Sequence, residues 1–508
     1  MKRLSFLLIP IFLALLLCSC TQDITDPKTL HAKTWPALFE EFWTVMNEDY
    51  VHFAYETETT DWDAVYENYS EKFKTLDYNK VEDTFTAFRY FKEIIVTLSD
   101  YHYHLILEDN FGYNLDARPS ALQKWLAAGQ TDIMDFPDIT KTENKVKNYY
   151  TVNGGPNKTF TREEILAKWN IAISGYTEVS DLQKAGTFHN PTGTVSDTFY
   201  TSTYGEVTKI AKIENNLYWD NFIVDAFGLE GTSWCTGVTK SGVLYIYFSQ
   251  FVDKDLIKLC NYLAKESTMT DEEKKEAKKE LPSTVNSAIT VYKMLDNEQK
   301  AQLSVIINIF KYLNQAVENN AITLEDDTSV PINGIVIDLR DNGGGYAAFF
   351  DLFMSTFFAS NKTIGYCRYK MGFSRYDYTP WTTFTLTNYN KALTEDYQGR
   401  LAIITNGFSV SCSELTTISS KLLPNSKTFG STTYGATCPL YSRDDYQSGT
   451  YENDNLTVRT TTFRFKAYDG TSYEGYGIEP DISIPLSTTE DNRFTAAVNW
   501  VANGVKSY

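Results

Sequence analysis

Residues 401–414 read LAIITNGFSVSCSE, an apolar run followed by a turn of small and hydroxyl-bearing side chains. The apolar run predicts a buried strand and the sequence after Glu414 predicts a helix, so the turn lies where a strand passes into a helix. The first N–H groups of a helix lack intrahelical acceptors, and with the helix dipole they favour a developing negative charge. The junction is therefore a place where a nucleophilic serine and an oxyanion can be held.

A second glycine-rich turn ends another apolar strand. Residues 334–337 predict that strand, and residues 338–345 read DLRDNGGG, a turn that can direct backbone N–H groups toward the same point as the first. Around both turns, predicted strands alternate with predicted helices, including a final helix over residues 492–503. This alternation predicts an α/β core with crossover connections, and the two turns predict one active site.

Composition sets the class of protein. The chain has 508 residues, of which 43% are hydrophobic and 22% charged, which is typical of a globular protein of two or three domains. Its formal net charge of −19 disfavours binding to nucleic acid, so no nucleic-acid partner is expected. Five cysteines remain after Cys18 and Cys20, without C-x-x-C spacing, so neither a disulfide framework nor a zinc motif is predicted.

The N-terminus predicts export from the cytoplasm. A basic start, an apolar run over residues 4–17 and the sequence Cys18-Ser19-Cys20 are typical of a signal peptide rather than a spanning helix. The segment resembles a bacterial lipobox, which implies a signal peptide over residues 1–19, a lipid such as palmitate on Cys20 and anchoring in the cell envelope. The outer membrane is the expected site, on its periplasmic or surface face. A plain cleaved signal peptide is the alternative.

The rest of the chain divides into four predicted regions. Residues 20–35 are polar and predict a tether, and residues 36–100 carry aromatic side chains at helical spacing and predict an N-terminal helical domain. Residues 101–240 form a variable middle region of weak pattern, and residues 241–508 form the α/β core.

Several segments resemble the ordered motifs of the tail-specific (C-terminal processing) serine peptidase family. They are residues 61–63, 98–102, 245–251, 338–345, 411–414, 433–435 and 475–481. The resemblance implies a ClpP/crotonase-like core that hydrolyses peptides through an acyl-enzyme on Ser411, with the backbone N–H groups of Gly344 and Cys412 as oxyanion donors. It implies no cofactor and no metal. Ser409 and Ser413 are the alternatives to Ser411, the first as a turn hydroxyl and the second as a helix cap.

The general base is the point at which the sequence departs from this pattern. The processing branch of the family uses a lysine at the position of Ala436, and no lysine occurs between Lys427 and Lys466. The tricorn-like branch uses a histidine after the N-terminal helical region, which the Asp100-Tyr101-His102 segment resembles, so the resemblance implies His102 as base. A neutral imidazole can accept a serine proton near pH 7.

Other readings of the histidines stay open. His104 is the nearest competitor, because it shares a face with His102 if the segment is extended. A structural role for His102 is an alternative, and a metal site with His104 lacks a third ligand of suitable spacing. Glu474 is a possible orienting acid. A PDZ domain, which the family often carries, is not recognisable in the middle region.

The sequence therefore predicts an envelope-anchored serine peptidase acting on peptide or protein substrates. A catalytically inactive peptidase fold that binds peptides or another envelope ligand is the alternative, and Ala436 favours it. A hydrolase that transfers a different acyl group is a third reading. Substrate, cleavage specificity and oligomeric state are not encoded in any motif that the sequence shows.

Overall fold

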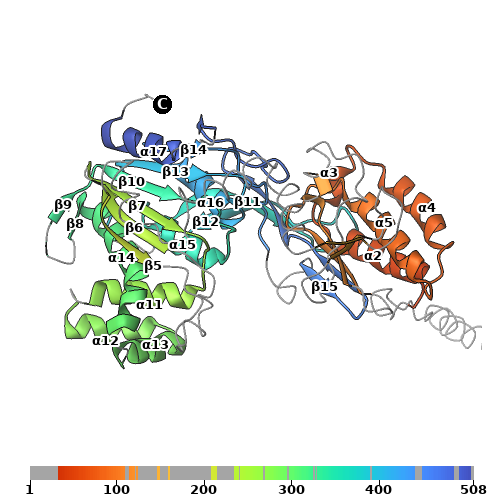
Figure 1. Ribbon diagram of the computed structural model, residues 1–508, viewed down its shortest axis with the longest axis horizontal. Coiled ribbons are helices and arrows are strands. Elements are labelled where there is room, and N and C mark those ends of the chain that lie inside the picture. The colour runs from red at the N-terminus through yellow and green to blue at the C-terminus, as the bar shows by residue number, and fades with distance from the viewer. Residues whose placement is uncertain are drawn as a thin grey trace, which may run out of the picture.

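The computed structural model describes most of the chain outside residues 1–32 and the predicted middle region (Figure 1). The described residues are 33–108, 114–120, 122–123, 146–148, 158–160, 207–213, 234–239, 241–266, 269–294, 297–323, 327, 329–388, 392–440, 449–485 and 491–504. The predicted signal peptide, Cys20 and most of the predicted tether and middle region lie outside them. Among the described helices, none is both long enough and apolar enough to cross a bilayer.

Four helices form the N-terminal unit. They are α2 (Trp35–Asp49), α3 (Phe53–Glu56), α4 (Trp62–Phe73) and α5 (Val81–Ile95). Thr34 and Asp61 cap α2 and α4, because each side chain accepts a hydrogen bond from the backbone N–H three residues later. The aromatic residues at helical spacing pack inward, and the rings of Phe39 and Phe73 stack with centroids 4.8 Å apart.

A four-stranded sheet completes this unit and extends it beyond the predicted boundary at residue 100. Its order is β15 (Thr450–Glu452), β16 (Leu456–Arg459), β1 (His104–Glu108) and β2 (Asn114–Ala117). Leu105 and Val458 belong to the same hydrophobic cluster as the helices. The strands β15 and β16, which come late in the chain, thus belong to the N-terminal unit. The local sequence pattern could not reveal this, because β1 and β16 are distant in sequence.

The core is a seven-stranded, mostly parallel sheet. Its order is β18 (Ile482–Ser483), β14 (Ser426–Gly430), β13 (Arg400–Thr405), β10 (Gly334–Asp338), β7 (Val243–Phe248), β6 (Trp234–Thr239) and β5 (Val207–Ile213). The strands from β18 to β7 are parallel, and β6 and β5 are antiparallel additions at one edge. Because β5 and β6 belong to this sheet, the core begins before the predicted boundary at residue 241.

Helices cover both faces of the core sheet (Figure 1). Every residue of β7 and β10 is buried, as expected for strands covered on both faces. Leu244 and Ile246 pack toward the face with most helices, whereas Val243 and Tyr245 pack toward α17 (Asn492–Asn503). The other core helices are α11 (Lys254–Glu266), α12 (Asp271–Glu280), α13 (Ser283–Met294), α14 (Asn297–Asn319), α15 (Ala347–Ser355) and α16 (Cys412–Ser420). The predicted α/β class and the predicted final helix are confirmed.

Smaller sheets flank the core. They are β12 (Thr382–Leu386) with β11 (Lys362–Tyr369) and β17 (Phe463–Ala467), β8 (Ala321–Thr323) with β9 (Ser329–Pro331), and β3 (Val146–Asn148) with β4 (Lys158–Phe160). The sheet of β11, β12 and β17 is antiparallel throughout. Its strand β12 supplies Phe384 to the cavity described below.

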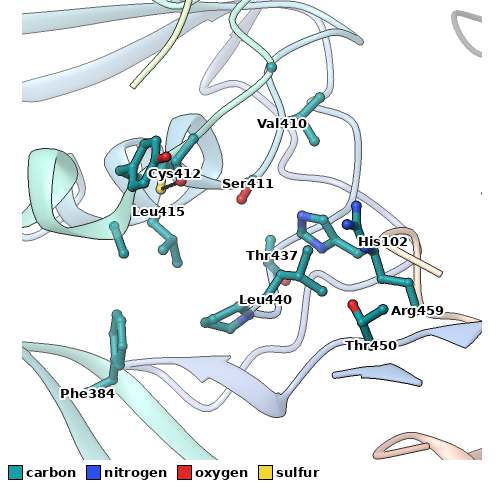
Figure 2. A pocket seen from close by; sticks show the side chains of 15 residues that line it. His102, Phe384, Val410, Ser411, Cys412, Leu415, Thr437, Leu440, Thr450 and Arg459 are labelled. Atoms are coloured by element: carbon teal, nitrogen blue, oxygen red, sulfur yellow. Dashed lines mark hydrogen bonds between the residues drawn. The ribbon is translucent and has the colours of Figure 1, made fainter. Parts of the chain in front are cut away.

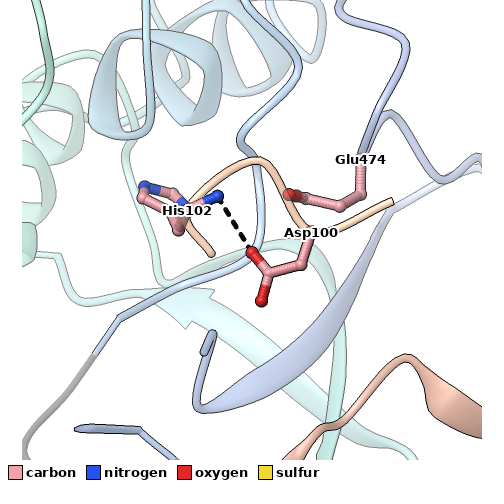
Figure 3. A group of neighbouring side chains, drawn as sticks. All are labelled: Asp100, His102 and Glu474. Carbon is pink, nitrogen blue, oxygen red and sulfur yellow. Dashed lines mark hydrogen bonds between the residues drawn. The ribbon is translucent and has the colours of Figure 1, made fainter. Parts of the chain in front are cut away.

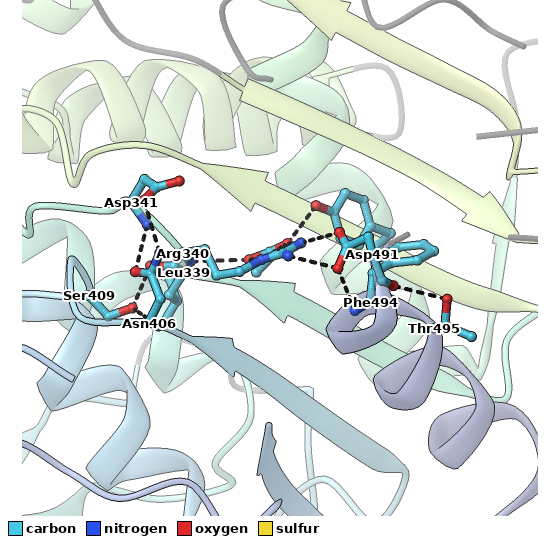
Figure 4. A network of polar contacts seen from close by, with 10 residues as sticks. Leu339, Arg340, Asp341, Asn406, Ser409, Asp491, Phe494 and Thr495 are labelled. Atoms are coloured by element: carbon cyan, nitrogen blue, oxygen red, sulfur yellow. Dashed lines mark hydrogen bonds and ion pairs between the residues drawn. The ribbon is translucent and has the colours of Figure 1, made fainter. Parts of the chain in front are cut away.

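A buried arginine fixes the turn after β10. The Arg340 guanidinium, 2% exposed, donates to Asp338, at the end of β10, and to Asp491, the residue that caps α17 (Figure 4). Its hydrogen bonds to these carboxylates are as short as 2.6 and 2.7 Å. These hydrogen bonds connect the final helix to the start of the glycine-rich turn, and so fix the position of that turn.

Candidate active site

The turns after β10 and β13 meet because the two strands are parallel neighbours. Asp338 and Ile404 pair at the carboxyl ends of these strands. Asp341 N–H donates to Asn406 Oδ1 at 3.1 Å, and Val410 N–H donates to Asn342 O at 3.0 Å, so hydrogen bonds join the turns directly. The two turns, which the sequence predicts to form one site, therefore lie together and are joined by hydrogen bonds.

Ser411 occupies a strained backbone position at the start of α16. Its φ of 57° and ψ of −114° lie in a region that residues other than glycine rarely adopt. Such strain of about 1–3 kcal/mol persists only where surrounding structure holds it, and it is concentrated at functional sites. The half-buried Ser411 side chain lines a cavity.

Ser409 and Ser413 have different surroundings. Both are fully buried. The Ser409 hydroxyl donates to Leu339 O at 2.8 Å and accepts from Asn406 N–H at 3.0 Å. The Ser413 hydroxyl lies 2.9 Å from both Asn342 O and Asn342 Oδ1. These two serines join the turns to each other, and Ser411 alone of the three lines the cavity.

The cavity has a volume of about 630 Å³ and lies beside the Ser411 turn (Figure 2). The structure brings Ser411 and His102 together here, and both side chains project into the cavity. Its lining residues are His102, Gly343, Gly345, Tyr346, Ala347, Phe384, Val410, Ser411, Cys412, Leu415, Thr437, Pro439, Leu440, Thr450 and Arg459. The apolar part of this wall can receive an apolar side chain of a bound peptide.

His102 lies in the turn between α5 and β1. Its backbone N–H donates to Asp100 Oδ1 at 2.9 Å, and its ring Nδ1 is buried without a hydrogen-bond partner among the described residues. Burial, followed by the nearby charge of Arg459, lowers the pKa of His102 to about 4. The imidazole is therefore neutral at pH 7, which is the state that a general base requires.

The structure separates His102 from its competitor. His104 is the first residue of β1, and its Nδ1 lies 3.8 Å from Asp116 Oδ1 on the neighbouring strand. It does not line the cavity. The shared face was expected only if the segment is extended. That condition is not met, because His102 precedes the strand and lies in a turn.

Two buried carboxylates accompany His102 (Figure 3). Asp100, His102 and Glu474 each have one ligand atom within 4.8 Å of those of the other two. Burial raises the pKa of Asp100 to about 6 and that of Glu474 to about 8. The sequence predicted Glu474 as an orienting acid. It lies beside His102 without a hydrogen bond to the ring Nδ1, so that role stays a prediction.

Among the described residues, Asp100, His102 and Glu474 form the group of possible ligands that lie close enough together to hold a metal ion. However, their carboxylate oxygens already accept protein hydrogen bonds. Asp100 accepts from the N–H groups of His102 and Thr461, and Glu474 accepts from the backbone N–H groups of Tyr101, Thr437 and Cys438. The cluster is therefore organised by backbone donors, which orient carboxylates without a cation.

The two predicted oxyanion donors differ in the hydrogen bonds that their N–H groups make in this structure. Gly344 has φ +86°, and a Cβ there would lie 2.6 Å from Ser411 Cβ, so this glycine permits the close approach of the two turns. Its N–H, however, donates to Asn342 Oδ1 at 2.9 Å. An oxyanion would have to compete with that amide oxygen. The N–H of Cys412 is the first of α16 and has no intrahelical acceptor.

Glu414 has a role that the sequence reading missed. Its buried carboxylate accepts hydrogen bonds from the backbone N–H groups of Ser411, Gly435 and Ala436 at 3.0, 2.7 and 2.8 Å. It also accepts from the Thr433 hydroxyl at 2.6 Å. Ala436 is thus a backbone donor, and no lysine is among the residues that line the cavity. The serine-x-x-glutamate spacing of a capping box was the available signal.

Comparisons with known proteins find similarity to solved structures and to one family model. No curated protein matches the sequence. Among solved structures, a candidate peptidase from Parabacteroides merdae is 17% identical, with 92% of this chain and 97% of that chain covered and a TM-score of 0.47. Mature CPAF bound to lactacystin is 10% identical, with 92% and 97% covered and a TM-score of 0.43. The photosystem II D1 C-terminal processing protease is 12% identical, with 93% and 99% covered and a TM-score of 0.36.

The family comparison concerns the core. Residues 304–484 match the model of peptidase family S41. This range contains both turns, Ser411, Glu414 and Glu474, whereas His102 precedes it. Over residues 304–484 the chain is therefore similar to peptidase family S41.

Proposed function

We propose that the chain is a serine peptidase that hydrolyses peptide bonds through an acyl-enzyme on Ser411, with His102 as general base. The observation that carries this proposal is the convergence of these two side chains, distant in sequence, on one cavity (Figure 2). The family S41 domain supports a serine peptidase of the tail-specific kind. The strained turn at Ser411 supports it independently.

The mechanism requires His102 to accept a proton and then donate it, once in acylation and once in deacylation. The neutral imidazole accepts the Ser411 hydroxyl proton while Oγ bonds to the substrate carbonyl carbon, and the carbonyl electrons move to oxygen. The imidazolium then donates that proton to the departing amine as the C–N bond breaks. Water, deprotonated by His102, attacks the ester carbonyl, and Ser411 leaves with the proton. Asp100 would stabilise the transient imidazolium through its negative charge, and Glu474 would add to this once it ionises, because its pKa is raised to about 8.

Backbone donors would stabilise the tetrahedral oxyanion. Cys412 N–H has the required position at the N-terminus of α16, and Gly344 N–H would contribute once its hydrogen bond to Asn342 opens. Loss of one such donor typically costs about 100- to 1,000-fold in rate.

A fluorophosphonate probe tests this proposal, because it reacts only with an activated serine. We expect the purified mature protein to label, labelling to be lost in Ser411→Ala and His102→Ala, and His104→Ala to label normally. Circular dichroism of each variant checks that it is folded. A folded wild-type protein that does not label would overturn the proposal.

The second candidate function is a non-catalytic protein that binds peptides in the same cavity. Ala436 in the place of the family's lysine and the engaged Gly344 N–H favour it. Peptide binding to a wild-type protein that does not label would establish this function. Ester and peptide substrates compared side by side would separate a peptidase from a hydrolase of other acyl groups.

We further propose that a lipid on Cys20 anchors the protein to the envelope. The support is the Leu17-Cys18-Ser19-Cys20 sequence after an apolar run. Metabolic labelling with palmitate should mark the wild-type protein and not Cys20→Ser, which should be found in the soluble fraction. Equal palmitate incorporation in both would contradict the anchor.

A further inference from the structure

The cavity wall has two chemically different sides (Figure 2). Phe384, Leu415 and Cys412 lie on one side of Ser411, whereas His102, Thr450 and Arg459 lie on the other. Arg459 is the one permanently charged side chain among the lining residues. A bound peptide therefore meets apolar groups on one side of its scissile bond and a cation on the other.

Among the described residues, Arg459 differs from most other arginines in having no hydrogen-bond or ion-pair partner. It is exposed at the end of β16, and the structure gives its side chain no hydrogen bond or ion pair with any described residue. Arg340 pairs with Asp338 and Asp491, Arg118 pairs with Asp116, and Arg375 pairs with Asp63. In a chain of net charge −19, an unpaired arginine inside a cavity is available for an external anion.

Strand pairing sets Arg459 beside the base. In the antiparallel ladder of β1 and β16, Arg459 lies opposite His104, two residues after His102. Thr450 of β15 lies on its other side and also lines the cavity. The Arg459 guanidinium is drawn next to the His102 ring in Figure 2. The group that His102 protonates in the proposed reaction is the departing amine, so Arg459 lies on the leaving-group side of the scissile bond.

We propose that Arg459 binds a substrate carboxylate on the leaving-group side, and so determines which peptides are cleaved. This inference rests on the proposed peptidase function. An arginine fork can accept both oxygens of a carboxylate, which fixes orientation as well as charge. The carboxylate has two possible sources, an acidic side chain after the scissile bond or the C-terminal carboxylate of a short leaving peptide. A neutral leaving segment offers no carboxylate, so the Arg459 guanidinium would form hydrogen bonds only with water.

The experiment uses internally quenched peptides with one apolar acyl side and three leaving segments. The first segment carries a glutamate and a C-terminal amide, the second is uncharged with a free C-terminus, and the third is uncharged with an amide. We expect kcat/KM for the first or the second to exceed that of the third by about three- to tenfold, because an exposed charge-assisted pair contributes modestly. Whichever segment shows the preference identifies the source.

Variants make the assignment to Arg459 specific. Arg459→Gln should abolish the preference, and Arg459→Lys should retain part of it because the charge remains. Arg89→Gln is the matched control, since it removes the same charge from α5 and does not line the cavity. Raising salt from about 50 to 500 mM should reduce the wild-type preference, as expected for a partly exposed charge pair.

The outcomes separate this inference from the proposed function. The fluorophosphonate probe has no carboxylate, so its reaction reports on Ser411 and His102 and not on the preference for a charged leaving segment. Circular dichroism shows whether Arg459→Gln is folded. Equal kcat/KM for all three peptides, or a preference that survives in Arg459→Gln, would overturn the role of Arg459 while leaving the peptidase intact. A wild-type protein that neither labels nor cleaves would overturn the proposed function, and this inference with it.

Discussion

Glu414→Gln should lower the reactivity of Ser411 about 100-fold, although Glu414 itself is buried and does not line the cavity. The buried carboxylate accepts from Ser411 and Ala436 N–H groups at Oε2, and from the Thr433 hydroxyl and Gly435 N–H at Oε1. Glutamine has the same shape, but one of its two terminal atoms is an NH₂ donor. In either orientation of the amide, at least one backbone N–H then faces another donor.

The magnitude follows from these contacts. One buried N–H left without an acceptor costs about 1–3 kcal/mol, and each remaining bond weakens by about 1 kcal/mol when its acceptor loses the charge. The change also removes a buried charge, whose desolvation raises the pKa of Glu414 and offsets part of the loss. A net decrease of about 2–4 kcal/mol in the free energy of unfolding follows. A displacement of about 1 Å at Ser411 would account for the 100-fold loss of reactivity.

Two measurements check this expectation. Urea denaturation followed by tryptophan fluorescence gives the free energy of unfolding, and the rate of fluorophosphonate labelling well below the urea midpoint gives reactivity. Glu272→Gln, on the exposed face of α12, makes the same chemical change and should alter neither quantity. If Glu414→Gln labels within threefold of wild type and is equally stable, the carboxylate does not hold the nucleophile.

Four other predictions concern His102, Glu474, the glycine-rich turn and the arginine beneath that turn. Because burial lowers the pKa of His102 to about 4, the labelling rate should persist at pH 5 and fall near pH 4. A labelling rate that already falls by half at pH 6.5 would contradict this. Burial raises the pKa of Glu474 to about 8, so this carboxyl gains its negative charge as pH rises from 7 to 9. The labelling rate should therefore increase over this range, and the increase should be absent in Glu474→Gln. Gly344→Ala should reduce labelling at least 100-fold, because a Cβ would lie 2.6 Å from Ser411 Cβ, and a normal labelling rate would refute the close approach. Arg340→Met leaves two buried carboxylates unpaired and should lower the free energy of unfolding by about 3–5 kcal/mol in urea titration, and a loss under 1 kcal/mol would count against the network.

The sequence predicted those features that depend on neighbouring residues. The strand, turn and helix around Ser411 and the glycine-rich turn before Gly344 are local patterns, since hydrophobic period and turn residues specify them directly. The final helix, with its aspartate cap at Asp491, is another such pattern and is observed over the predicted residues. Local sequence therefore predicted the strand, turn and helix around Ser411 correctly.

Features that depend on long-range contacts were less accessible. The pairing of β1 with β16, which gives Arg459 its position, joins segments that no local periodicity connects. The hydrogen bond from Gly344 N–H to Asn342 depends on a side-chain rotamer, and the four bonds of Glu414 depend on the position of a distant loop. A pattern can indicate that a residue type is suitable, but the acceptor that a donor finds is decided by tertiary structure.

The two buried glutamates explain how the separate parts of the site are held together. Glu474 accepts from Tyr101 N–H, next to His102, and from the N–H groups of Thr437 and Cys438. Glu414 accepts from Ser411 N–H and from the Gly435 and Ala436 N–H groups of the same loop. Residues 433–438 thus connect the segment of His102 to the turn of Ser411 through two carboxylates. The position at which the processing branch carries its lysine is occupied here by Ala436, and its backbone N–H belongs to the connection between Ser411 and His102.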